Sequence, residues 1–330
     1  MPMNILVQKI ARIRPWIIVA VVLGMLSSMA ANAQIPPRFY WKTLQGMNAV
    51  PVIAMSVSGN VNPLDPSYHL DPTASISADV AIAGYAKMFP VWNKAAMLAV
   101  LMPMGRIEGE FLAGREASSG FGDPMVEFNI NLIGPPPIMN LPDMLRYEPG
   151  FSLDLVVDVM FPLGQYDNTQ SLNLGQNRWY GRIGTPIVWQ LGPWIPASRT
   201  TLEIFPSVYF FGDNDDFVGQ NLHSDPTFAL EVHLTRNFTS NFWGSIDATY
   251  SSSGDTTIGT DMPTSGSDMT LVGFTLGYEL NDSLGLTIGY KSTLNNDAAS
   301  DELRMSTFNL SLTTAWHRLL EGAARLNSGG

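Results

Sequence analysis

The sequence TLVGFTLGYELNDSLGLTIGYK, residues 270–291, carries the pattern that decides the fold class. On both sides of Asn281-Asp282-Ser283, bulky apolar residues alternate with glycine, threonine and occasional charges. Alternation with a period of two over ten residues indicates a strand, and two such runs around a turn indicate a hairpin. Because Leu280 and Leu284 share a face only across a three-residue loop, the pattern predicts a three-residue turn. A membrane barrel turns such a bulky face toward lipid, whereas a soluble sandwich buries it.

The start of the chain resembles a secretory signal peptide. Basic residues precede the apolar run 16–26, and Ala31-Asn32-Ala33 provides a cleavage site after Ala33. This run is shorter than the ~20 residues that a membrane helix needs, which disfavours the alternative of an uncleaved anchor. We therefore expect a signal peptide at 1–33, one barrel at 34–316 and a periplasmic tail at 317–330.

The composition excludes one class of partner. The chain has 330 residues, 45% of them hydrophobic, and no cysteine. Cleavage after Ala33 removes three of 18 basic residues, which leaves 15 against 29 acidic residues and a net charge of −14. Such a charge repels nucleic acid, so nucleic acid is not expected as a partner. Without cysteine, the stability of an exported chain must come from its strand network.

Period-two segments recur along the chain and predict twelve strands, an even number that closes a barrel with both termini on one side. Connections alternate between short and long, as in outer-membrane barrels, although the proline-rich connection 134–149 is longer and has room for a helical turn at 143–146. The expected fold is an all-β, antiparallel, up-and-down transmembrane barrel of the outer-membrane type. The predicted strands are 46–58, 74–86, 94–104, 123–133, 150–161, 179–191, 200–211, 227–236, 241–250, 270–280, 284–291 and 304–316.

Aromatic residues near the strand ends predict girdles at the two membrane interfaces. One girdle would contain Trp92, Trp189, Trp194, Trp243 and Trp316, and the other Tyr180, Phe210, Tyr250 and Tyr290. The long loops 212–226 and 251–269 are too polar for a bilayer and are expected to face outside.

Several turn-rich motifs carry a family resemblance. They are Ser119-Gly120-Phe121-Gly122-Asp123-Pro124, Gly164-Gln165-Tyr166-Asp167, Asn173-Leu174-Gly175-Gln176-Asn177-Arg178-Trp179, Phe210-Phe211-Gly212-Asp213-Asn214 and Asp225-Pro226. Together they resemble the outer-membrane "meta-pathway of phenol degradation" family over roughly 38–250. The resemblance implies a barrel in the envelope and transport of aromatic or other hydrophobic solutes, and it implies no catalytic residues. The C-terminus departs from the usual barrel end, because fourteen residues follow Trp316.

Charged residues on the strands are expected to face the lumen, because a charge facing lipid costs about 2–4 kcal/mol near the midplane. These inward positions include Asp79, Glu127 and Glu279, while Gly273 and Gly277 would leave one wall nearly bare. The charges are interpreted as cross-lumen ion pairs that hold the barrel in shape, as a selectivity ring, or as both. The candidate pore-lining residues are Asp154, Asp158, Arg182, Glu203, Glu231, His233, Asp247 and Lys291.

The sequence offers little support for catalysis or metal binding. None of the four histidines, His69, His223, His233 and His317, lies in a hydrolase motif, so an outer-membrane hydrolase is a minor alternative. Asp213, Asp215 and Asp216 resemble the start of a calcium loop, but the required glycine and glutamate do not follow. We expect no cofactor and interpret these residues as a solvated acidic loop. The six long loops hold 16 acidic and 3 basic residues, which favours cations at the mouth.

Parity makes a sharper prediction for strands 227–236 and 241–250. Both strands place even-numbered residues outward, so the residue numbers of two paired residues must add up to an even number. With the turn at 237–240, the expected sums are 476 or 478. A sum of 478 would place Glu231 opposite Asp247, and 476 would make these carboxylates diagonal neighbours. The prediction is a polar site of Glu231, His233 and Asp247 on the inner wall, with far-wall basic residues as the structural alternative.

These observations predict a passive outer-membrane channel for small organic solutes. A non-transporting envelope barrel that anchors the surface or binds a partner is the first alternative. The expected partners are outer-membrane lipid, lipopolysaccharide, small organic solutes and the barrel-assembly machinery.

Overall fold

The structure, a computed structural model, describes residues 36–67, 74–294, 303–320 and 322. The predicted signal peptide 1–33, His69 and most of the predicted tail lie outside these residues. The large sheet contains β1 (Asn48–Gly59), β2 (Ser75–Val91), β3 (Lys94–Phe111), β4 (Gly114–Phe121), β5 (Met125–Ile133), β6 (Phe151–Met160), β7 (Tyr180–Gly184), β8 (Ile187–Gln190), β9 (Thr200–Phe211), β12 (Thr227–Asn237), β13 (Phe242–Ser252), β15 (Asp268–Asn281), β16 (Leu284–Thr293) and β17 (Met305–Trp316). A small separate sheet contains β10 (Asn214–Phe217), β11 (Gln220–Ser224) and β14 (Thr256–Ile258).

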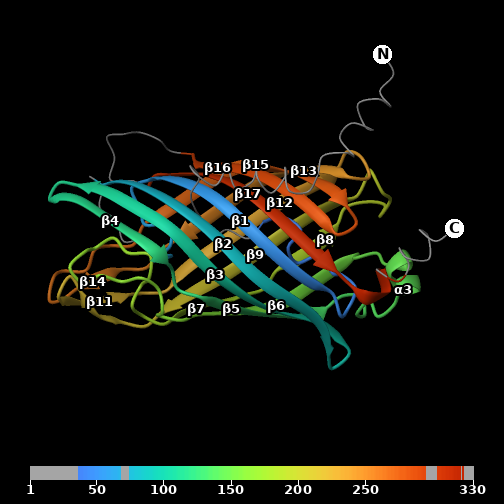
Figure 1. The fold of residues 1–330 in the computed structure, drawn as a ribbon, viewed down its shortest axis with the longest axis horizontal. Helices are drawn as coiled ribbons and strands as arrows, with labels where there is room; N and C mark the ends of the chain where they lie inside the picture. Colours follow the sequence, from blue (N-terminus) through green and yellow to red (C-terminus); the bar gives the residue numbers. More distant parts are fainter. Residues whose placement is uncertain (1–35, 68–73, 295–302, 321, 323–330) are drawn as a thin grey trace, which may run out of the picture.

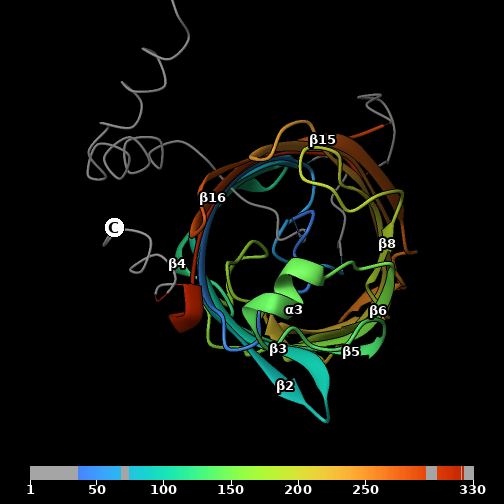
Figure 2. The same ribbon diagram turned by 90° about the vertical axis from the view of Figure 1, so that its right-hand side faces the viewer.

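The large sheet closes into an antiparallel barrel, because β12 pairs with β13 on one side and with β9 on the other (Figures 1 and 2). Twelve strands form the wall, since β7 and β8 are two segments of one strand and β4 extends β3 outside the main order. The predicted strand number and fold class are therefore confirmed. Strands β1 and β17 pair over their whole length and are antiparallel. The first wall strand therefore begins at the same end of the barrel at which the last wall strand ends.

The two ends of the barrel differ. One end, here called the short-turn end, carries the hairpin turns and the helix α3 (Leu141–Arg146); the other, the long-loop end, carries β4, β11 and β14 (Figure 1). Helix α3 confirms the helical turn expected in the proline-rich connection, and it lies across the barrel mouth (Figure 2). The Asn140 side chain caps it by accepting the Asp143 N–H, which satisfies a donor that the first helical turn leaves free. No helix in the described ranges is long and apolar enough to span a membrane.

Two predicted turns need correction. In the β15–β16 hairpin, Glu279 pairs with Gly285 and Asn281 with Leu284, so two residues form the loop and a bulge takes up the third. A bulge inserts one unpaired residue, which preserves the parity that the sequence required. The hairpin between β2 and β3 is also tighter than expected, because pairing continues to Val91 and Lys94. Residues 105–122, expected to be a loop, are mostly strand, since the second half of β3 pairs with β4.

The outer face of the barrel is apolar over most strands, as expected for a face in contact with lipid. Outward residues of neighbouring strands are exposed, among them Ile183, Leu234, Ile246, Phe274 and Ile288. Asp79 is an exception, because it is exposed on β2 rather than directed into the lumen. Its cross-strand partner is Arg106, which forms an ion pair with Glu108. At this end of β2 the neighbouring strand β3 pairs with β4 at the long-loop end, and a charge there faces water at little cost.

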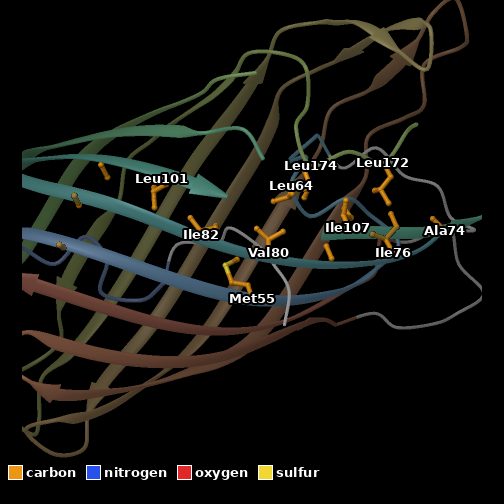
Figure 3. Packing of buried hydrophobic residues seen from close by; sticks show 14 of the residues in the cluster. Met55, Leu64, Ala74, Ile76, Val80, Ile82, Leu101, Ile107, Leu172 and Leu174 are labelled. Carbon is orange, nitrogen blue, oxygen red and sulfur yellow. The ribbon is translucent and has the colours of Figure 1, made fainter. Parts of the chain in front are cut away.

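The inner face of β2 is correspondingly apolar. Ile76, Ala78, Val80 and Ile82 are buried inside the barrel, against Met55 of β1 and leucines of the long loops (Figure 3). The expectation that bulky residues face outward therefore fails on this strand. Its physical reason is that chain segments, rather than water, occupy this side of the lumen.

The predicted aromatic girdles are only partly formed. Trp92, Trp189 and Trp316 are exposed at the short-turn side, and Phe210 and Tyr290 are exposed on the outer face. Two members point inward instead. Trp243 is buried beside Arg38, and Tyr180 lines a lumen cavity. Trp194 contacts Trp41, which belongs to a segment inside the barrel.

Candidate functional site

The segment 36–43 lies inside the lumen and divides it. The Arg38 backbone N–H donates to Glu203 Oε2 at 2.8 Å, and the Trp41 indole N–H donates to Glu203 Oε1 at 2.8 Å. The Arg38 guanidinium lies 4.3 Å from the ring centroid of Trp41 and 4.2 Å from that of Trp243. Cation–π contacts of this kind are strongest when water is excluded. The sequence pattern predicts no strand in this segment, but its dense aromatic and basic residues are a signal that it packs.

Lys42 fixes the other end of this segment. Its ammonium group pairs with the Asp154 carboxylate, whose other oxygen accepts the Asn131 side-chain N–H at 2.8 Å. Tyr40 packs edge-on against Phe205 at 5.2 Å between ring centroids. Both ends of the segment are thus held to the barrel wall by buried polar contacts.

Two cavities lie on either side of this segment. The cavity toward the short-turn end has a volume of about 180 Å³ and is lined by Tyr40, Trp41, Tyr147, Trp194 and Arg199, among others. The second, toward the long-loop end and here called the long-loop cavity, has a volume of about 130 Å³. Pro36 and Phe39 line the long-loop cavity, so the N-terminal segment forms part of its wall.

Several predicted inward charges meet beside the long-loop cavity. Glu127, Asp158 and Arg182 stand directly opposite one another on β5, β6 and β7. Arg182 Nε donates to Asp158 Oδ2 at 2.5 Å, and Nη1 lies 3.7 Å from Glu231 Oε1. Arg182 Nη1 also donates to the Tyr209 hydroxyl at 3.3 Å. Opposed carboxylates destabilise a sheet, and this guanidinium offsets part of that repulsion.

Other predicted residues form a second row around the inner wall. Glu203 pairs with His233, His233 with Asp247, and Gly273 with both Asp247 and Lys291. His233 Nδ1 lies 2.7 Å from Asp247 Oδ1, and Asp247 also accepts hydroxyl hydrogens from Ser245 at 2.7 Å and Thr275 at 2.6 Å. The Ser245 hydroxyl donates to Asp247 rather than to His233, so this group lacks the nucleophile–base contact of a hydrolase.

The parity prediction for β12 and β13 is wrong in register. Paired residues sum to 480, which places Glu231 opposite Thr249 and His233 opposite Asp247. The reason is that pairing continues to Asn237 and Trp243, which makes the turn start later than expected. His233 and Asp247 therefore meet as predicted, whereas Glu231 faces Arg182 instead.

The glycine wall is not bare. A Cβ at Gly277 would overlap the Trp243 ring, and one at Gly273 would overlap the Tyr290 carbonyl oxygen and Lys291. Gly277 therefore makes room for a large inward side chain, and Gly273 allows the backbone of β16 to approach closely. Lys291 is buried and donates to the Thr249 hydroxyl at 3.4 Å.

A buried guanidinium, Arg178, ties the long loops together. It donates to both Asp65 oxygens, at 2.9 and 3.1 Å, and to the Ser224 hydroxyl at 2.9 Å. Asp123 accepts the N–H groups of Gly164 and Gln176 at 2.9 and 2.7 Å. Sequence reasoning missed both side chains as structural elements, although each lies in a motif that carried the family resemblance.

The acidic loop forms contacts of its own. Asp213 lies 2.7 Å from His223 Nδ1, Asp215 accepts from Asn221, and Asp216 accepts from Asn168. The hydrogen bond with Asp213 raises the pKa of His223 above its ordinary value. Within the described ranges, no three acidic or histidine side chains converge to hold a metal ion.

One of the solved structures to which the chain is similar shares this fold. The COG4313 outer membrane channel from Pseudomonas putida F1 has 18% sequence identity and a TM-score of 0.68; the alignment covers 86% of this chain and 100% of that one. The transport unit of the autotransporter AIDA-I from Escherichia coli has 8% identity and a TM-score of 0.46, over 87% and 95% of the two chains. The Pseudomonas putida toluene transporter TodX has 8% identity and a TM-score of 0.42, over 87% and 94%.

No curated protein matches the chain by sequence. A family model does match, over residues 54–304, which is most of the barrel. It covers the motifs around Asp123 and Arg178 that hold the long loops together. The chain belongs to the family described as "Putative MetA-pathway of phenol degradation".

Proposed function

We propose that the protein is an outer-membrane channel for small, largely apolar organic solutes. The observation that carries this proposal is the long-loop cavity, which lies inside a barrel and is lined on one side by Ile53, Met55, Ile82 and Leu101. A passage for sugars or ions has no need of such a wall, whereas an apolar solute leaves water favourably there. Its volume of about 130 Å³ is close to the ~150 Å³ cavity that holds one benzene molecule.

A cavity-filling substitution tests this function. Ala229 is buried and lines the long-loop cavity, so Ala229→Trp should occupy it without changing the charge. We expect uptake of radiolabelled toluene by cells that express the variant to fall to that of cells without the protein. Ala81→Trp, on the outer face of β2, is the matched control and should behave as wild type. Equal uptake by the Ala229→Trp and wild-type proteins would contradict the proposal.

The N-terminal segment favours a second candidate, a non-transporting envelope barrel. Arg38, Trp41 and Lys42 hold this segment across the lumen, and Arg178 holds the long loops together at one end. A plugged barrel of this kind would act as a surface anchor or bind a partner. Toluene uptake equal to the protein-free level, together with absent single-channel conductance after reconstitution, would favour this candidate over the channel.

The orientation belongs to the same proposal. We infer that the long-loop end faces the outside, because its loops are polar and acidic. Outer-membrane lipid, lipopolysaccharide and the barrel-assembly machinery are the partners that this location implies. A peptide tag inserted at Ser265 should be reached by antibody on intact cells. Labelling only after the outer membrane is permeabilised would reverse the orientation.

A further inference from the structure

The long-loop cavity has two chemically different walls. One is apolar and comes from β1, β2 and β3, and the other includes Glu127, Arg182 and Glu231. All three charged residues are buried, with at most 4% of any of them exposed to solvent. A solute in this cavity therefore touches hydrocarbon on one side and ionisable groups on the other.

The charged wall has more carboxylates than cations. Arg182 is directly hydrogen-bonded to Asp158, whereas Glu127 Oε2 is 4.0 Å and Glu231 Oε1 3.7 Å from its nitrogens. Among the residues that the structure describes, Oδ1 of Asp158, both oxygens of Glu127 and Oε2 of Glu231 are buried without a hydrogen-bond partner. Burying such oxygens without a hydrogen bond destabilises the folded protein. A ligand that donates hydrogen bonds to them therefore recovers a large part of the lost free energy.

Four other cations inside the barrel, all among the described residues, are engaged elsewhere. Arg38 lies between two indole rings and donates to Asn237, Lys42 pairs with Asp154, and Lys291 donates to Thr249. Arg178 is committed to Asp65. The carboxylates of the long-loop cavity therefore face one guanidinium, which Asp158 already occupies.

We propose that this cavity binds an apolar solute that carries a protonated amine. The ammonium group supplies a positive charge and three N–H donors to a wall that holds more carboxylates than cations, and the hydrocarbon part lies against the apolar wall. The long loops support this assignment independently, because their 16 acidic and 3 basic residues enrich cations at the mouth. The inference rests on the proposed channel function and names the class of solute.

Three single-ring probes of nearly equal size separate charge from hydrophobicity. Benzylamine, benzyl alcohol and benzoate are titrated at neutral pH against the protein in nanodiscs, with empty nanodiscs as the control for partitioning into lipid. We expect benzylamine to bind at least about tenfold more tightly than benzyl alcohol, because charge-assisted hydrogen bonds exceed neutral ones. Benzoate should bind most weakly. Equal affinities for the amine and the alcohol would overturn the inference and leave the proposed channel for apolar solutes intact.

Substitutions of Glu127 and Glu231 test whether these two residues cause the preference for benzylamine. Glu231→Gln removes one negative charge and Glu127→Gln removes one carboxyl group, each with little change in shape, and either should reduce the preference for benzylamine while benzyl alcohol binding stays near wild type. Asp79→Asn removes a charge from the outer face and should leave the preference unchanged. If Glu127→Gln does not fold, judged by heat-modifiable gel mobility, Glu231→Gln alone decides the question. An unchanged preference in the folded variants would contradict the assignment.

Discussion

The two walls of the lumen are built by opposite rules. On β1 to β3 the inward side chains are apolar, and Val80 and Ile107 are almost completely buried against leucines of the long loops. On β5 to β16 most of them are charged or polar, although Val156, Phe205 and Leu271 are apolar, and Glu127 and Asp247 are just as deeply buried. Both walls belong to one continuous hydrogen-bonded sheet. The difference shows that the chain segments packed inside a small barrel determine whether the inward side chains of each strand are apolar or polar.

The occupants of the lumen explain the contrast. Leu64, Leu172 and Leu174 pack against the apolar wall, so water is excluded there and apolar residues are favoured. The N-terminal segment brings Arg38 and Lys42 to the opposite wall, where Glu203 and Asp154 receive its backbone and side-chain donors. The predictions below test this division, from the largest expected effect to the smallest.

The charged wall should depend most on Arg182. Replacement by Met leaves Asp158, Glu127 and Glu231 buried without their cation, and breaking a buried pair in this way costs about 3–5 kcal/mol. We expect a large decrease in the urea concentration at the unfolding midpoint in lipid vesicles. Met55→Leu on the apolar wall is the control and should cost less than about 1.5 kcal/mol. Similar midpoints for both variants would remove the distinction between the walls.

Gly277 tests whether the charged side of the lumen is tightly packed. A methyl group in Gly277→Ala would overlap the Trp243 ring, and overpacking costs about 1–3 kcal/mol. The free energy of unfolding and the Trp fluorescence spectrum should both change. Trp243→Ala in the same chain should relieve the overlap, so the double variant should lose less stability than the two single effects added together. Strict additivity would show that the ring and the glycine do not touch.

Val80 tests the apolar wall. Val80→Ala removes two buried methyl groups, and at about 0.8 kcal/mol for each buried carbon the free energy of unfolding should fall by about 1.6 kcal/mol. Ser77→Ala, at an exposed position of the same strand, should have an effect near zero. A loss as small for Val80→Ala as for the control would mean that water fills this side of the lumen.

The smallest expected effect concerns His223 in the small sheet outside the barrel. The Asp213 carboxylate raises the pKa of His223 in the folded protein, so this contact stabilises the sheet at low pH and the stabilisation is lost as pH rises through that raised pKa. In Asp213→Asn the pKa, measured by NMR titration of the imidazole, should fall toward its ordinary value. Asp215→Asn, whose side chain contacts Asn221, should leave it unchanged.

Local patterns predicted much of the barrel. Alternation around Asn281 to Ser283 identified the hairpin, and similar runs identified all twelve wall strands, because a period of two is visible in each segment alone. The His233–Asp247 contact was also within reach, since both residues lie near one turn. Their register was wrong because the turn lies later than its sequence suggested: pairing ends at Asn237 and Trp243 rather than at residues 236 and 241.

The lumen was not predictable in the same way. Arg38 and Glu203 are 165 positions apart, Arg178 and Asp65 are 113 apart, and Lys42 and Asp154 are 112 apart. No local sequence pattern relates such residues. The sequence around a charged strand residue is the same whether its side chain contacts a cation, another carboxylate or water. The sequence by itself determined the strands, their number and most of the lipid-facing side, because those depend on neighbours within a few residues. Only the tertiary structure decided which wall is apolar, where the N-terminal segment lies and which carboxylates remain unpaired, because those depend on contacts made after the barrel closes.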